Sequence, residues 1–198
     1  MSPDYLAGNS REYIARHESG HAVGYWSQGI PLAYVTIVGH GSQPRPHTQP
    51  VDPAQAGYGQ KILAYASGVI AGFQYNRQRL SDAGIAELLV GSADDQFEIV
   101  GLVSGARTRL PRAPLVGPGE DLELISPEAT EQPFTASHAV TFWRDCERFV
   151  VSVAPAIDAI AQRLAGSGHL GGSEVAALAV AGMTGRPTAW IPRWVAEQ

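Results

Sequence analysis

With 198 residues, of which 44% are hydrophobic and 17% charged, the chain is long enough to bury the core of one domain. The formal net charge is −5 and the 14 Lys and Arg are scattered, so we expect no partner that needs a basic patch, neither nucleic acid nor anionic lipid. Cys146 is the single cysteine, which excludes an internal disulfide and a cysteine-rich zinc site and predicts a packing role in a reducing compartment.

The first predicted element is a helix from about Asn9 to Gly29. Asn9 and Glu12 have the spacing of a capping box. The helix contains His17-Glu18-Ser19-Gly20-His21, which has the H-E-x-x-H form of zinc peptidases. Residues four apart share one face of a helix, so both imidazoles can reach one Zn²⁺ ion. Glu18 lies beside them, where it can take a proton from a metal-bound water.

Two glycines lie inside this predicted helix. Gly20 and Gly24 each weaken its propensity by about 1 kcal/mol relative to alanine, a cost tolerated where another segment packs closely against the backbone. An alternative is an amphipathic core helix whose two histidines only form hydrogen bonds. That alternative leaves a glutamate at the general-base position unexplained.

The elements that follow alternate between regular and irregular segments. Residues 33–38 are rich in β-branched side chains and predict a short strand, whose edge could pair with an extended peptide. Residues 39–59 are rich in proline and predict a loop. Residues 60–79 predict a second helix, apolar around most of its circumference and therefore buried. Short helices are expected at 81–90 and from Ser92 to Gly105.

The second half of the chain begins with an irregular connector at 108–133, rich in Pro and Gly. A helical pattern covers 136–164 with a kink or break at Pro155, and a last short helix starts at Ser173. Altogether the pattern predicts a mainly α fold with a small β element next to the H-E-x-x-H helix. We expect a single domain over residues 1–189 and a C-terminal tail at 190–198 that docks onto the core or onto a partner.

A catalytic zinc site normally has three protein ligands, so two histidines do not complete it. Ser27 stands where the third histidine of the metzincin motif would be, which excludes that class. No Glu occurs between His21 and Glu87, so the nearby glutamate of thermolysin-like enzymes is absent too. A more distant carboxylate is required.

Five segments in the same order resemble the FtsH-like family of zinc metallopeptidases. The sequence HESGHA at 17–22 resembles the family's H-E-A-G-H-A helix, and VTI at 35–37 resembles the strand that follows it. A weaker similarity links 66–73 to the family helix L-G-G-R-A-A-E-E, although Gly72 and Phe73 replace its paired glutamates. GSADD at 91–95 resembles the G-A-S-N-D segment, and residues 163–175 resemble A-L-L-x-x-x-x-L-D-G-E-E-V. The resemblance implies a helical metallopeptidase domain.

The resemblance also implies that Asp95 is the third zinc ligand, because the Asp of G-A-S-N-D has that role in the family. From the residues alone, Asp95 fits better as a capping-box acid that serves Ser92. Glu98 lies one helical turn further on the same face and is the other candidate ligand, whereas Asp94 is expected to be solvated. The remaining histidines, His40, His47, His138 and His169, are expected to be surface or loop residues.

The expected function is that of a zinc-dependent endopeptidase, with Glu18 as the base and His17, His21 and Asp95 as ligands. The Walker motif is absent and no apolar run approaches the ~20 residues of a membrane span, so the expected activity is ATP-independent or served by an ATPase or adaptor in trans. We expect a cytoplasmic chain and a polypeptide substrate. The alternative is a non-hydrolytic zinc-binding regulatory module derived from such a peptidase.

Overall fold

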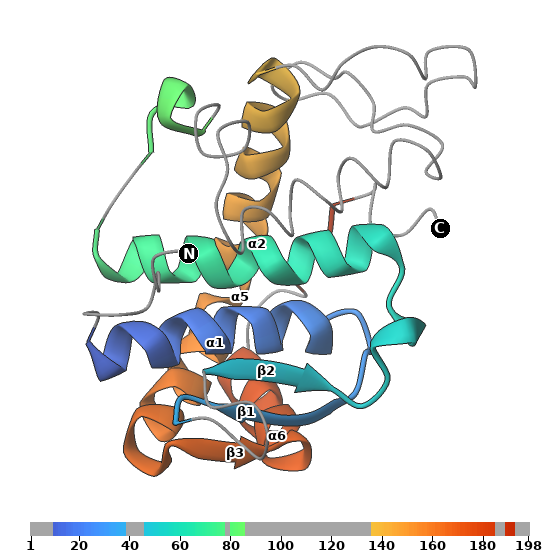
Figure 1. Cartoon of the computed structure of the whole chain (residues 1–198), viewed down its shortest axis with the longest axis vertical. Coiled ribbons are helices and arrows are strands. Elements are labelled where there is room, and N and C mark those ends of the chain that lie inside the picture. Colours follow the sequence, from blue (N-terminus) through green and yellow to red (C-terminus); the bar gives the residue numbers. More distant parts are fainter. Residues whose placement is uncertain (1–9, 39–45, 78–79, 86–135, 185–188, 193–198) are drawn as a thin grey trace, which may run out of the picture.

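The computed structural model describes residues 10–38, 46–77, 80–85, 136–184 and 189–192, which are mainly helical with one small sheet (Figure 1). The described elements, in chain order, are α1 (Arg11–Trp26), β1 (Leu32–Thr36), β2 (His47–Pro50), the 3-10 turn η1 (Pro53–Gln55), α2 (Tyr58–Tyr75), α5 (Ala136–Ser167), β3 (His169–Gly171) and α6 (Gly172–Met183). Residues 82–85 are helical as well, at the start of the short helix predicted for 81–90. The predicted fold class is confirmed at this level. The predicted connector at 108–133 and the helix from Ser92 lie outside the described residues.

Helix α1 carries the H-E-x-x-H motif and has a clear cap at its start. The N-cap is Ser10, whose hydroxyl accepts a hydrogen bond from the Tyr13 amide at 3.1 Å. The prediction that Asn9 caps this helix is wrong by one residue, because Glu12 then falls at the second helical position rather than the third. The predicted end is confirmed: Gly29 has a φ of +74°, a left-handed conformation that glycine adopts without strain.

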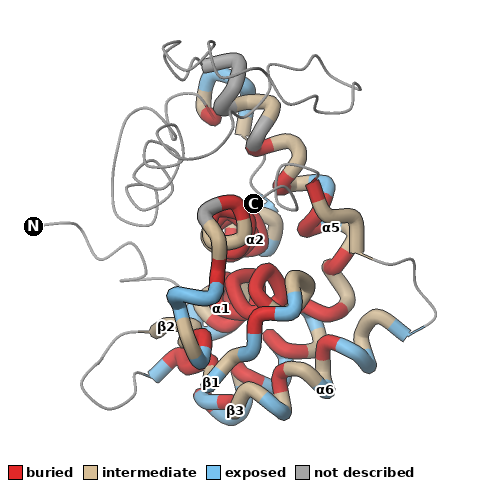
Figure 2. Tube along the Cα trace, turned by 90° about the vertical axis from the view of Figure 1, so that its right-hand side faces the viewer, coloured by how far each residue is buried: buried red, intermediate tan, exposed pale blue. Residues whose placement is uncertain are grey.

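Helices α1 and α2 lie side by side with their backbones in close approach (Figures 1 and 2). A Cβ atom on Gly20 would lie 2.4 Å from the carbonyl oxygen of Ser67, and one on Gly24 would lie 2.6 Å from the Cα of Ala64. Any larger side chain at these two positions would therefore push the helices apart. The close packing predicted from the two glycines is confirmed, and α2 is buried along most of its length as predicted.

The sheet has the strand order β2-β1-β3, and both pairings are antiparallel. The strand predicted at 33–38 is confirmed as β1, but it is the central strand. The prediction that its edge is open to a peptide is wrong, because β2 and β3 form hydrogen bonds to its two sides. The prediction of a loop throughout 39–59 is wrong at His47–Pro50, which forms β2. Its Pro50 is tolerated because it is the last residue of an outer strand.

Helix α5 is continuous through Pro155, so the chain does not break there, and the predicted kink stays a prediction. The proline has no amide proton to donate to the carbonyl of Val151, a residue on the exposed side of the helix. One side of α5 packs into the core, and its buried residues recur at steps of three and four: Trp143, Cys146, Phe149, Val150, Val153, Ala156, Ile157, Ile160 and Leu164. The packing role predicted for Cys146 is confirmed.

Residues Trp143–Ser167 of α5 are long and apolar enough to cross a membrane by length and composition alone. The central helix of a globular core has the same properties, and the buried side of α5 contacts α1, α2 and α6 (Figure 2). The expected absence of a membrane span stays a prediction.

The end of the described chain is tied to the core. Helix α6 begins at Gly172, one residue before the predicted Ser173. A Cβ on Gly172 would lie 1.7 Å from the carbonyl oxygen of Leu32, so this position requires glycine. Trp190 packs against the core, its amide donates to the Ser152 hydroxyl at 3.1 Å, and the Arg148 guanidinium lies 5.0 Å from the centre of its ring. The first residue of the predicted tail therefore docks onto the core.

Candidate metal centre

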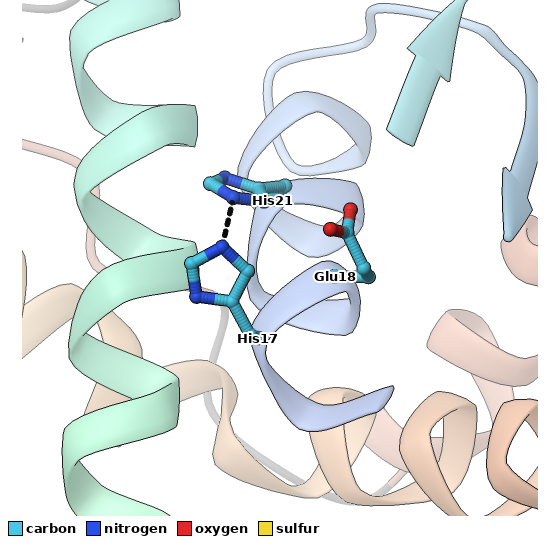
Figure 3. Close-up of side chains that lie close together, drawn as sticks. All are labelled: His17, Glu18 and His21. Atoms are coloured by element: carbon cyan, nitrogen blue, oxygen red, sulfur yellow. Dashed lines mark hydrogen bonds between the residues drawn. The ribbon is translucent and has the colours of Figure 1, made fainter. Parts of the chain in front are cut away.

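The two histidines of the motif lie against α2, with their rings between the two helices (Figure 3). The Nε2 atoms of His17 and His21 are 2.9 Å apart. Both side chains are buried, at 1% and 8% exposure. The two Nε2 atoms therefore point to one place.

The hydrogen bond of His21 to α2 fixes which of its nitrogens is available. Its Nδ1 lies 3.0 Å from the carbonyl oxygen of Ala64. A carbonyl only accepts, so Nδ1 carries the proton and donates, and the Nε2 of the neutral ring holds a lone pair directed at His17. His17 Nε2 can donate its proton to this lone pair, and in the other neutral tautomer of His17, which carries the proton on Nδ1, Nε2 offers a lone pair of its own. An imidazole whose other nitrogen donates to a backbone carbonyl is the usual form of a metal-bound histidine.

Gly68 of α2 makes the space that the His21 ring occupies. A Cβ on Gly68 would lie 2.2 Å from Cε1 of that ring and 2.4 Å from each of its nitrogens. The neighbouring aromatic rings enclose the pair: Tyr13 stacks on His17 with centroids 6.4 Å apart, and Tyr65 lies edge-on to His21 at 5.9 Å. The two rings are therefore held in place by their surroundings on several sides.

Glu18 leaves α1 on the side nearer the strands, whereas the two histidines lie on the side that faces α2 (Figure 3). Its carboxylate is buried, at 3% exposure. The Thr48 hydroxyl of β2 lies 2.9 Å from Oε2 and 3.0 Å from the backbone carbonyl oxygen of Glu18. A carboxylate is costly to bury unless hydrogen bonds compensate for the lost water, and Thr48 supplies such a bond.

One ligand atom from each of His17, Glu18 and His21 lies within 4.8 Å of the others. Within the described ranges, this is the one group of at least three His, Cys, Asp or Glu close enough to hold a metal ion. Two convergent imidazole nitrogens with a nearby carboxylate match the ligand types of zinc, so the residues present fit the ion implied by the motif. Asp95, the predicted third ligand, and its neighbours Asp94 and Glu98 lie outside the described residues.

Two of the remaining histidines lie on the sheet, away from this cluster. His47 and His169 both pair with Thr36, on β2 and β3, and flank Tyr34 on the sheet face opposite Thr48. The Tyr34 hydroxyl lies 2.8 Å from His47 Nε2. His169 is exposed, as expected, but both residues belong to strands rather than loops. His40 and the side chain of His138 lie outside what the structure describes.

Three residues of the site were not identified from the sequence: Thr48, Ala64 and Gly68. The last two belong to a row of small residues, Ala64, Gly68 and Gly72, spaced four apart as Gly20 and Gly24 are. That spacing was a usable signal for close helix pairing. Nothing in the sequence around Thr48 signals its contact.

No model of a known protein family matches the chain, and no curated protein sequence matches it. The function of the chain is therefore inferred from the geometry of the site and from the motif that forms it.

Proposed function

We propose that the chain is a zinc-dependent endopeptidase that hydrolyses peptide bonds of unfolded proteins or peptides. One observation carries this proposal: the Nε2 atoms of two buried imidazoles are 2.9 Å apart, and a carboxylate oxygen of Glu18 lies within 4.8 Å of a nitrogen of each ring. A structural zinc site has no need of a carboxylate that is positioned beside its ligands, whereas hydrolysis needs a base there.

His17 and His21 would hold the ion through Nε2, and Asp95 is the proposed third protein ligand. A bound Zn²⁺ would lower the pKa of the water that it binds and would polarise the scissile carbonyl. Glu18 accepts the proton of the attacking water and passes it to the leaving amine.

The sheet offers a place for the substrate. In the described sheet β2 is an outer strand, and its Thr48 contacts Glu18, so a peptide paired along β2 would run next to the base. Main-chain hydrogen bonds of this kind do not depend on side-chain identity. This supports extended, unfolded polypeptides as substrates and replaces β1 with β2 as the proposed docking strand.

The proposed setting is cytoplasmic, in agreement with a single, buried cysteine. The peptidase would act without ATP or be served by an ATPase or adaptor in trans. The second candidate function is a non-hydrolytic zinc-binding module. The low exposure of all three motif residues favours it, because substrate must reach the base.

The test is the Glu18→Gln variant, which keeps the shape of the side chain and removes the base. We expect this variant to keep one zinc per chain and to lose at least ~10²-fold in the hydrolysis of casein or a fluorogenic peptide. Glu12→Gln, on the exposed first turn of the same helix, is the matched control and should behave as wild type. Equal rates for wild type and Glu18→Gln would contradict the mechanism. A zinc-loaded wild type that hydrolyses nothing would favour the regulatory module.

A further inference from the structure

The contact between β2 and Glu18 poses a geometric problem for the proposed base. A carboxylate within 4.8 Å of both imidazole nitrogens is close enough to turn toward them and bind the metal directly. As a ligand it could no longer accept a proton from water, and it would fill the position that the water needs. A residue must therefore hold the carboxylate in its present orientation.

Thr48 has the position and the chemistry for this role. Its hydroxyl has one proton and two acceptors in reach, Oε2 of Glu18 at 2.9 Å and the Glu18 carbonyl oxygen at 3.0 Å. Hydrogen bonds to an ionised acceptor are stronger than those to a neutral one, so the carboxylate is the favoured acceptor. Thr48 is itself fixed by the sheet, where it pairs with the fully buried Val35.

We propose that Thr48 is a positioning residue that keeps the Glu18 carboxylate out of the coordination sphere of the bound metal and available as the base. The proposal depends on the proposed function for its catalytic meaning. Its structural part, the restraint on Glu18, is tested by metal binding alone.

The test compares three variants. Thr48→Val removes the hydroxyl and keeps a β-branched side chain of similar shape, and Thr48→Ser restores the hydroxyl. Thr36→Val is the matched control, since Thr36 is a buried threonine of the adjacent strand whose hydroxyl donates to the Gly168 carbonyl and not to Glu18. The Gly168 carbonyl oxygen still accepts a hydrogen bond from the Ile37 amide in that control, so the substitution does not leave this oxygen without a donor.

The first readout is metal coordination. Zinc affinity is measured against a competing chelator, and the visible spectrum of the Co²⁺-substituted protein reports the ligand set. In Thr48→Val we expect an altered cobalt spectrum and zinc binding at least as tight as in wild type, because Glu18 joins the ligands. Thr48→Ser and Thr36→Val should match wild type in both measurements.

The second readout is hydrolysis. In Thr48→Val we expect kcat to fall about 10- to 100-fold, the usual effect of removing a residue that orients a metal site, with KM little changed. A wild-type protein that binds metal but hydrolyses nothing contradicts the proposed function. The cobalt spectrum of Thr48→Val still tests whether Thr48 restrains the Glu18 carboxylate. A Thr48→Val protein with the wild-type spectrum and zinc affinity overturns the restraint, as does an equal loss of kcat in Thr36→Val. A protein that binds neither ion overturns both.

Discussion

Adding one methyl group at Gly68 is the sharpest perturbation that the structure suggests for the metal centre. In Gly68→Ala the new Cβ would lie 2.2 Å from His21 Cε1, whereas ordinary contact begins at 3.4 Å. The ring or the helix must therefore move by the difference, about 1.2 Å. Such a shift exceeds what the 3.0 Å hydrogen bond from His21 to Ala64 can absorb. We expect the bond that orients the ring to break, and zinc affinity to fall about 10- to 100-fold.

The same substitution also changes the stability of the metal-free protein. Alanine gains up to ~1 kcal/mol over glycine inside a helix, but forcing extra volume into a close-packed site costs ~1–3 kcal/mol. The net expectation is a loss of up to ~2 kcal/mol in the free energy of unfolding, measured by urea denaturation in chelator.

Gly166→Ala is the control for Gly68→Ala, because it makes the same change in α5, where no atom lies within 4 Å of the added Cβ. It should leave zinc affinity unchanged and stabilise by roughly 0.5–1 kcal/mol. If Gly68→Ala binds zinc as tightly as wild type, His21 does not lie against Gly68 as described, and the proposed role of α2 in orienting His21 is refuted.

Two further predictions concern the third ligand and the buried thiol. Zinc titration against a chelator should rank Asp95→Ala as severely weakened, Glu98→Ala as mildly weakened and Asp94→Ala as unchanged apart from a helix-end effect of up to ~1 kcal/mol; normal binding by all three would place the ligand elsewhere. Burial raises the pKa of the Cys146 thiol, so the folded state retains a proton that the unfolded state releases above ~8.5. Stability should therefore fall, by at most ~1.4 kcal/mol per pH unit, as the pH rises above ~8.5, and less steeply in Cys146→Ala. Equal pH slopes for the two proteins would contradict this.

Local signals in the sequence predicted the helical part of the fold. Spacing at three and four residues identified α1, α2 and the long α5, and Gly20 and Gly24 indicated the close approach of α1 and α2. These features depend on interactions within one helix or on its apolar face. A break at Pro155 does not occur, because residues on both sides of the proline pack into the same core, which is a tertiary property.

The two outer strands could not be predicted in the same way. β2 and β3 have four and three residues, too few for a periodic pattern, and each is a strand because it pairs with β1. The residues of the site also differ in how far their contacts extend along the sequence. His17, Glu18 and His21 follow from their spacing on one helix, but the contact of Glu18 with Thr48 spans 30 positions and that of His21 with Ala64 spans 43.

Strand β1 pairs on one side with β2, which is close to it in the sequence, and on the other side with β3, which is far from it in the sequence, and this affects how the chain folds. The residues of the metal centre that the structure describes come from α1, β2 and α2, which have all been synthesised once the ribosome has passed Tyr75. Strand β3, by contrast, pairs His169 with Thr36 across more than half of the sequence. Contacts this distant in sequence form slowly and late. A chain that ends before His169 has its motif helix and its first hairpin, yet one side of β1 stays unpaired. Such an open strand edge is a template for pairing with other chains, so truncated products should aggregate rather than accumulate as a small peptidase.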